Sequence, residues 1–175
     1  PYIFTDDELA KFVDAARVRQ QGENSAVRQE IYAVLFGLMA STGLRISEVL
    51  NLTLSDVLPD GVLHIRNTKF GKCRMVPLHP SVVRVLKQYM DLRLAVMAED
   101  DHLFLSEGNR KIYYSVPQRA FHEILALADI APGRSRRPRI HDLRHTFATR
   151  VLAQCGAGRE AISRHAVALM TYMGH

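Results

Sequence analysis

The sequence contains little cysteine, and this scarcity bears on both its chemistry and its compartment. Its two cysteines, Cys73 and Cys155, lie far apart and form neither a C-x-x-C pair nor a zinc-ligand spacing. The pattern therefore gives no support to a disulfide framework of the kind that small secreted domains use. We expect both residues to be free thiols in a reducing compartment.

Long hydrophobic runs are also missing. The longest apolar stretch, residues 31–40, contains Tyr32 and Gly37 and is shorter than the roughly 18 to 20 residues of a membrane span. We interpret it as a buried helix. The first ten residues include the acidic run Asp6-Asp7-Glu8, which is not the pattern of a signal peptide. Together these absences predict a cytoplasmic protein with no membrane partner.

Positive charge is present in modest excess, and its placement is uneven. The 175 residues, a length typical of one domain, carry a formal net charge of +5. That excess alone only weakly favours a polyanionic partner. Four arginines within six residues form what we call the basic loop: Arg134, Arg136, Arg137 and Arg139. The loop could simply be solvated, but it leads directly into a helix with His141, which favours phosphate contact.

Hydrophobic periodicity predicts a mostly helical α+β domain that covers residues 1–175. Helices are expected at residues 5–16, 26–41, 46–51, 80–97, 115–128, 141–154 and 159–172. Short strands are expected at residues 54–58, 62–66 and 73–78, whereas residues 103–105 could be a brief strand or an extended link. The fold class is therefore α+β with a small three-stranded antiparallel sheet.

The stretch 139–149 begins as an arginine-rich loop and becomes an amphipathic helix. His141 and Arg144 are three residues apart, so both leave the same side of the first helical turn. A charged oxygen there would meet a fixed cation, a titratable imidazole and the positive end of a helix dipole. This arrangement suits phosphate chemistry.

A metal site is the competing interpretation of the same helix. His141 and His145 are four residues apart, which would suit two zinc ligands on one helical face. However, Asp142 follows His141 where the metalloprotease helix has its glutamate, and Arg144 would repel a cation. We expect no metal, and we expect His145 to pack in the helix interface or to lie beside the phosphate. A metal-dependent hydrolase would instead predict stoichiometric zinc.

Several blocks of the sequence, in order, resemble the tyrosine recombinase (phage integrase) family. They are Thr-Gly-Leu-Arg-Ile-Ser-Glu at residues 42–48, the His-x-x-Arg-His-Thr-Phe-Ala helix at 141–148 and Met-Gly-His at 173–175. A hairpin-like segment at residues 67–78 also ends in that family's Val-Pro-Leu. The resemblance spans nearly all of a catalytic domain and implies a DNA recombinase or integrase of the phage or mobile-element type.

The same resemblance implies catalytic roles. Arg45 and Arg144 would clamp the scissile phosphate and stabilise a pentavalent transition state, and His141 and His175 would contact the same phosphate. Taken alone, Arg45 could as well be a surface arginine. Glu48 would orient an arginine or a histidine, although an ordinary acid on the helix surface fits the same spacing.

A lysine at the tip of the hairpin would be the general acid. Lys69 is favoured because the family's lysine lies in this hairpin, and a flexible ammonium can donate a proton to a leaving oxygen. Lys72 is the competitor, and either lysine could be no more than a turn charge. We place Lys72 with the basic loop among the expected contacts to DNA phosphates.

The nucleophile that the resemblance implies is a tyrosine downstream of the Gly-His pair. It would form a 3′-phosphotyrosyl intermediate with no metal or nucleotide cofactor. No tyrosine follows His175 in the sequence, whereas Tyr172 precedes the pair and Tyr113 and Tyr114 lie before a different helix. We therefore expect residues 1–175 to be a fragment that lacks both the nucleophile segment and the family's amino-terminal DNA-clamping domain, and to be inactive alone.

The expected partner is double-stranded DNA in the bacterial cytoplasm, at the nucleoid. The resemblance implies a homotetramer on DNA for the intact protein, and we expect a monomer for this fragment. An alternative is a cleavage-dead DNA-binding module from a truncated recombinase. Type IB topoisomerases share the chemistry, but the bacterial-looking block at residues 42–48 and the compact size favour an integrase.

Overall fold

The computed structural model describes residues 1–20, 25–66, 73–133, 137–154 and 159–174. Its helices are α1 (Asp6–Arg19), α2 (Ala26–Thr42), α3 (Ile46–Leu50), α4 (Pro80–Leu94), α5 (Ser115–Leu127), α6 (Ile140–Ala153) and α7 (Arg159–Met173), with a 3-10 turn η1 (Leu54–Asp56) and strands β1 (Val62–Ile65) and β2 (Arg74–Pro77). The predicted class, mostly helical with a small antiparallel sheet, is confirmed.

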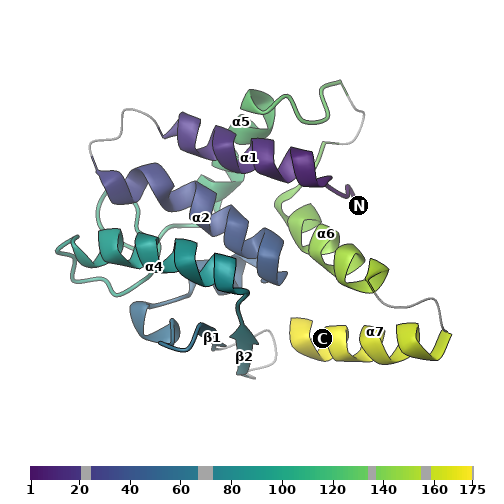
Figure 1. Ribbon diagram of the computed structural model, residues 1–175. Coiled ribbons are helices and arrows are strands. Elements are labelled where there is room, and N and C mark those ends of the chain that lie inside the picture. Colours follow the sequence, from purple (N-terminus) through teal and green to yellow (C-terminus); the bar gives the residue numbers. More distant parts are fainter. Residues whose placement is uncertain (21–24, 67–72, 134–136, 155–158, 175) are drawn as a thin grey trace.

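Helix α2 is the centre of the fold. It packs against α1, α4 and α6, while α5 packs against α1 (Figure 1). Its apolar residues are buried all round, as expected for a helix with no polar face. Phe36 of α2 meets Phe12 of α1 and Phe121 of α5 with ring centroids 5.5 Å apart in both pairs. These rings form an interior to which α6 and α7 are added at one end.

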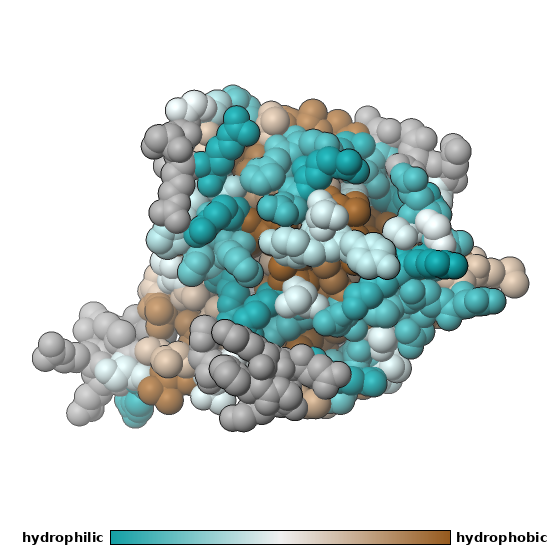
Figure 2. Space-filling model, turned by 180° about the vertical axis from the view of Figure 1, so that it is seen from behind, coloured by the Kyte–Doolittle hydropathy of each residue, from teal (hydrophilic) through white to brown (hydrophobic). Residues whose placement is uncertain are grey.

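The face behind this view is mainly polar. Figure 2 shows hydrophilic residues over most of it, with hydrophobic residues visible in the hollows between them. No helix among the described residues is both long enough and apolar enough to cross a membrane. Cys73 is exposed and free, whereas Cys155 lies outside the described residues.

The sheet differs from the prediction in one respect. In the described residues it has two strands, β1 and β2, paired antiparallel with Val62 opposite Pro77. The third strand predicted at residues 54–58 is wrong. The Asp56 carboxylate accepts hydrogen bonds from the Thr53 amide (2.9 Å) and hydroxyl (2.8 Å), and this local contact folds the segment into η1. Val57 keeps only an isolated bridge to Leu63.

One boundary also differs, because helix α4 ends at Leu94 rather than near residue 97. Of the two alternatives for residues 103–105, the brief strand is not formed, and Leu105 makes one isolated bridge to Lys111. The tip of the hairpin, residues 67–72 with Lys69 and Lys72, lies outside the described residues.

Candidate active site

Helix α6 begins with an acid that caps its own first turn. The Asp142 carboxylate accepts a hydrogen bond from the Arg139 amide at 2.8 Å, and Asp142 is almost fully buried. Ile140 and Leu143 lie in the core on the same side of the helix. Because the core face is fixed in this way, the adjacent side of the helix presents His141 and Arg144 to a cavity.

The far end of α6 is tied to the start of the chain. The Phe4 amide donates to the Thr146 hydroxyl (3.0 Å), which itself donates to the Asp142 carbonyl (2.8 Å). Farther along the helix, the Arg150 guanidinium donates to the Phe4 carbonyl and pairs with Asp6 at 2.5 Å. The orientation of α6 therefore depends on the first six residues.

Arg45 is positioned by the same kind of cap as α6. The Glu48 carboxylate accepts from the Arg45 amide at 2.8 Å and so starts the short helix α3. The preceding turn is possible because Gly43 has φ +65°, where a side chain would be strained, and a Cβ there would clash with the Phe147 ring of α6. This close approach brings the 42–48 block against α6.

Arg144 joins three separated segments of the chain. Its Nη1 donates to the Gly43 carbonyl at 2.6 Å, and its Nη2 donates to the Met173 carbonyl at 2.9 Å. Burial, followed by the positive charge of Arg45, lowers the pKa of Arg144 to about 10, although Glu48 opposes this. The guanidinium therefore stays charged at neutral pH.

The predicted phosphate residues meet at one cavity of about 320 Å³. Its lining comprises Arg45, His141, Arg144, His145, Ala148, Leu169, Met170 and Met173. The basic side chains come from α6 and from Arg45, the residue just before α3, and the apolar ones come largely from α7. An anion would meet two guanidinium groups and two imidazoles at this place, so the cavity suits a phosphate.

His141 is held toward its neutral form. Partial burial of the imidazole, followed by the charges of Arg144, His145 and Arg139, lowers its pKa below the ordinary value of 6.5, with Asp142 acting in the opposite direction. A neutral imidazole at pH 7 can both donate and accept a hydrogen bond. His141 can therefore contact a phosphate oxygen or exchange a proton with it.

Glu48 is enclosed by two guanidinium groups. Its carboxylate accepts from Arg45 Nη1 (3.0 Å) and, as a bidentate pair, from Arg74 Nη1 (2.8 Å) and Nη2 (2.9 Å). Burial alone would raise the pKa of Glu48, but the hydrogen bonds from Arg74 and from the Arg45 amide, together with both charges, bring it below 4.5. Glu48 is thus in direct contact with Arg45, and the orienting role expected for it stays a prediction.

Arg74 is the residue at this site that the sequence reasoning missed. It lies on β2 two positions before Val76, which is fully buried. Side chains two apart on a strand share a face, so the inward direction of Arg74 was present in the pattern. A charged arginine on the core side of a strand is rarely buried unless an acid pairs with it, and Glu48 is that acid.

The end of α7 meets the arginines through its backbone. Arg45 donates to the carbonyls of Met173 (3.5 Å) and Gly174 (3.4 Å), and Gly174 has φ +72°. Tyr172 stacks on Phe147 with centroids 5.8 Å apart, and burial raises its pKa. These contacts favour a packing role for Tyr172 rather than that of a nucleophile.

The remaining predicted residues are not all at this cavity. Tyr113 and Tyr114 are exposed at the start of α5 and are not among the lining residues. His175 and the basic-loop residues Arg134 and Arg136 lie outside the described residues. Arg139 is exposed beside Asp142.

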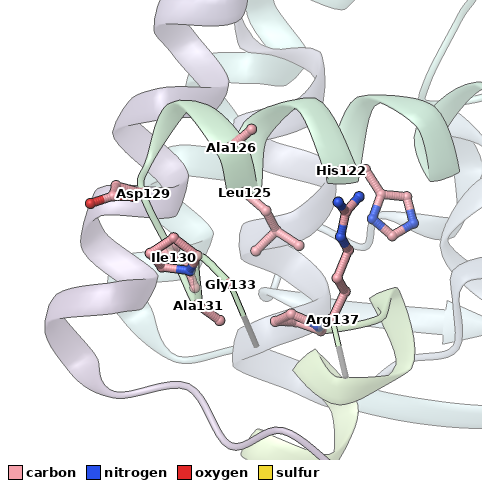
Figure 3. A pocket seen from close by; sticks show the side chains of 10 residues that line it. His122, Leu125, Ala126, Asp129, Ile130, Ala131, Gly133 and Arg137 are labelled. Carbon is pink, nitrogen blue, oxygen red and sulfur yellow. The ribbon is translucent and has the colours of Figure 1, made fainter. Parts of the chain in front are cut away.

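Arg137 lines a different cavity, of about 390 Å³, between α5 and the loop before α6. Figure 3 shows its guanidinium directed toward His122 of α5. Of the two basic-loop arginines that the structure describes, Arg137 therefore lines this second cavity, whereas Arg139 is exposed beside Asp142.

A group of three possible metal ligands occurs elsewhere in the described residues. Asp100, Asp101 and His102 place ligand atoms within 4.8 Å of one another. The Asp100 carboxylate already accepts hydrogen bonds from the His102 amide (2.9 Å) and the Lys111 amide (2.8 Å). These hydrogen bonds hold the loop together, and they account for the grouping without a metal ion.

Comparison with known proteins gives the family. The model of the phage integrase family matches residues 3–165. The Sinorhizobium fredii protein that carries the provisional name integrase/recombinase y4rB is 34% identical over 181 residues, which cover all of this chain and 58% of that protein. The tyrosine recombinase XerC of Agrobacterium fabrum is 32% identical over 158 residues, covering 89% of this chain and 47% of that protein.

Solved structures share the fold. The XerA recombinase crystal structure superposes with a TM-score of 0.73 at 28% identity, covering all of this chain and 60% of that one. The XerH recombinase bound to its difH substrate gives 0.74 at 24% identity over all of this chain and 47% of that one. The chain belongs to the phage integrase family and corresponds to a tyrosine recombinase catalytic domain. It spans roughly half the length of the curated relatives named above.

Proposed function

We propose that the intact protein is a site-specific DNA recombinase or integrase that cuts and rejoins strands through a 3′-phosphotyrosyl intermediate. The observation that carries the proposal is the meeting of Arg45 and Arg144 with His141 at one cavity. These residues come from blocks about 100 positions apart, since Arg144 contacts Gly43 directly. A fold that brings two guanidinium groups and an imidazole together in this way fits a phosphate that gains charge during reaction.

The reaction would proceed by attack of a tyrosine hydroxyl on phosphorus. The proposal places that tyrosine outside residues 1–175. The tyrosine hydroxyl gives up its proton to a base, for which the neutral His141 imidazole is the candidate, as its oxygen bonds to phosphorus. The bond from phosphorus to the 5′ oxygen breaks, and the leaving oxygen takes up a proton. The sequence resemblance proposes Lys69 as the proton donor and His175 as a further phosphate contact. The phosphotyrosyl bond keeps the energy for rejoining, so no cofactor is needed.

The arginines can change acceptors when DNA binds. The contacts of Arg45 to the carbonyls of Met173 and Gly174, at 3.5 and 3.4 Å, are at the long limit for hydrogen bonds. A phosphate oxygen offers shorter, charge-assisted bonds of about 2.8 Å. Substrate phosphate would therefore replace these carbonyls, while Arg144 keeps its bond to Gly43 as a fixed anchor.

Double-stranded DNA is the proposed substrate, and a homotetramer on DNA is the proposed assembly. The structural relatives include a recombinase bound to its DNA substrate and a lambda integrase tetramer on a Holliday junction. We further propose a bacterial cytoplasmic, nucleoid-associated setting. Residues 1–175 alone would bind DNA as a monomer without cutting it.

The test is covalent trapping on nicked DNA by the intact protein and its Arg144→Lys variant. Lysine keeps the charge but loses the planar fork, so cleavage should slow by about 100-fold or more while DNA affinity changes little. Arg93→Lys is the matched control, because buried Arg93 of α4 also donates to backbone carbonyls, those of His102 and Asp100, but does not line the cavity. Unchanged cleavage by Arg144→Lys would show that the assignment is wrong. DNA binding without cleavage by the intact protein would favour the cleavage-dead module.

A further inference from the structure

We propose that Arg74 is a positioning residue of this site: it holds the Glu48 carboxylate so that the guanidinium of Arg45 stays directed toward the cavity. The inference rests on the proposed function. It concerns a residue on the hairpin strand β2, which lines no part of the cavity itself.

The hydrogen bonds around Glu48 fill both of its oxygens. Oε1 accepts from Arg74 Nη1 (2.8 Å) and Arg45 Nη1 (3.0 Å), and Oε2 accepts from Arg74 Nη2 (2.9 Å) and the Arg45 amide (2.8 Å). The side chains of Glu48 and Arg74 are 5% and 13% exposed, so solvent offers few substitutes. The carboxylate is therefore fixed in one rotational position.

This position limits how Arg45 can bind Glu48. Arg45 reaches the carboxylate with one guanidinium nitrogen, Nη1, because Arg74 already forms the parallel two-bond pair. Without Arg74, the same carboxylate could turn and take a bidentate pair with Arg45, the geometry that arginine and carboxylate prefer. That pair would draw Arg45 Nη2 away from the cavity. Arg74 prevents this because it already binds both carboxylate oxygens of Glu48.

Arg74 also supplies charge and contact. Arg45, Arg74 and Arg144 carry three positive charges against the one negative charge of Glu48, so the cluster keeps a surplus for an anion. At the end of α7, a Cβ on Gly174 would lie 2.9 Å from Arg74 Nη1. Arg74 thus joins the hairpin to α3 and to the last turn of α7, the three parts that must keep register around the phosphate.

The experiment compares single-turnover covalent complex formation by the intact protein and its Arg74→Met and Arg74→Lys variants. Arg74→Met should slow the step by on the order of 10- to 100-fold, the usual effect of losing a partner that orients a functional group. DNA affinity should stay within about twofold because Arg74 touches no cavity surface. Arg74→Lys should recover part of the rate, since it restores charge but not the fork.

Arg66→Met is the matched control. Arg66 follows β1 and pairs with the buried Asp56 carboxylate at 2.6 Å, so the variant removes an equal charge from the same hairpin. Its rate should stay near that of the unchanged protein. An equal loss in Arg66→Met and Arg74→Met would show that a general weakening of the hairpin is responsible, and it would overturn the proposal.

The pH profile separates positioning from a merely structural role. The groups facing Glu48 are Arg45 from α3, Arg74 from β2 and Arg144 from α6. With Arg74 removed, the Glu48 carboxylate should take up a proton at higher pH, so the variant should lose rate earlier as pH falls toward 4.5. In the Glu48→Gln background, Arg74→Met should cause little further loss. Fully additive losses, or an unchanged pH profile, would refute the proposal.

One readout does not depend on cleavage. If the unchanged intact protein forms no covalent complex, the proposed function fails, and carboxyl carbon NMR of Glu48 then decides on Arg74. The Glu48 pKa should rise in Arg74→Met and rise less in Arg74→Lys. A Glu48 pKa that is equal in all three proteins would overturn the inference.

Discussion

Replacing Glu48 with glutamine should destabilise the protein strongly, although the two side chains have the same shape. The carboxylate accepts four hydrogen bonds and lies between Arg45 and Arg74. An amide group keeps one oxygen acceptor and turns an NH2 toward donors, so about two contacts become repulsive. Among the described residues, Glu48 is the acid that pairs with Arg45 and with Arg74, so both guanidinium groups would lose that anion.

The magnitude follows from these contacts. Each hydrogen bond to a charged group contributes about 1.5–3 kcal/mol, which gives roughly 3–6 kcal/mol for two. The Arg45 and Arg74 side chains are 20% and 13% exposed, so some relaxation toward water is possible. We therefore expect a loss near the lower limit, about 3 kcal/mol in the free energy of unfolding. For a domain of this size that corresponds to about 6–12 °C in melting temperature.

The assay is urea and thermal unfolding followed by circular dichroism. Glu30→Gln is the control, because Glu30 pairs with Arg17 at 3.1 Å on the surface and should contribute less than about 1 kcal/mol. The difference between Glu48→Gln and the unchanged protein should be full above pH 4.5 and shrink as pH falls through the lowered pKa of Glu48. Equal unfolding midpoints at neutral pH would refute this account of the site.

Three further predictions concern the backbone, the imidazole and the loop. Gly43→Ala should lower the free energy of unfolding in urea by about 2–4 kcal/mol, because of left-handed backbone strain and the clash with Phe147. Gly37→Ala should instead raise it by about 0.5–1 kcal/mol, because the added Cβ meets no atom within 4 Å in α2. The His141 imidazole should titrate by NMR below 6.5, so its contribution to stability is complete above that pH and declines as pH falls below it; a value of 6.5 or higher would contradict the burial argument. Arg139→Gln should reduce the salt dependence of DNA binding by about one phosphate contact, and an unchanged slope would remove Arg139 from the DNA surface.

The sequence was informative where a local signal and the tertiary fold agree. The continuous apolar run at residues 31–40 predicted a buried helix, and α2 is that helix. The order of the family blocks predicted a catalytic domain of this class, which the family comparison confirms. The predicted roles of Arg45 and Arg144 stay predictions, although the fold brings both residues to one cavity.

Two features, the segment 54–58 and the role of Arg74, were not predicted correctly, each for a physical reason. Residues 54–58 have a strand-like pattern, but the Asp56 carboxylate accepts hydrogen bonds from the Thr53 amide and hydroxyl. These bonds hold the segment in a turn that cannot pair as a strand with β1. Arg74 was overlooked because a charged residue beside a hairpin tip is usually solvated. Its inward direction depended on its register with Val76 and on a carboxylate 26 positions earlier, which no local pattern contains.

The attachment of the first residues to α6 affects how this protein can be shortened. A chain that began after Phe4 would lose two hydrogen bonds, the one that the Phe4 amide donates to the Thr146 hydroxyl and the one that Arg150 donates to the Phe4 carbonyl. Thr146 lies one turn beyond Asp142 on the helix that carries His141 and Arg144. Trimming a few residues at one end would therefore loosen a helix about 140 positions away. An inactive shortened version would indicate a loss of support for the site rather than a missing reactive group.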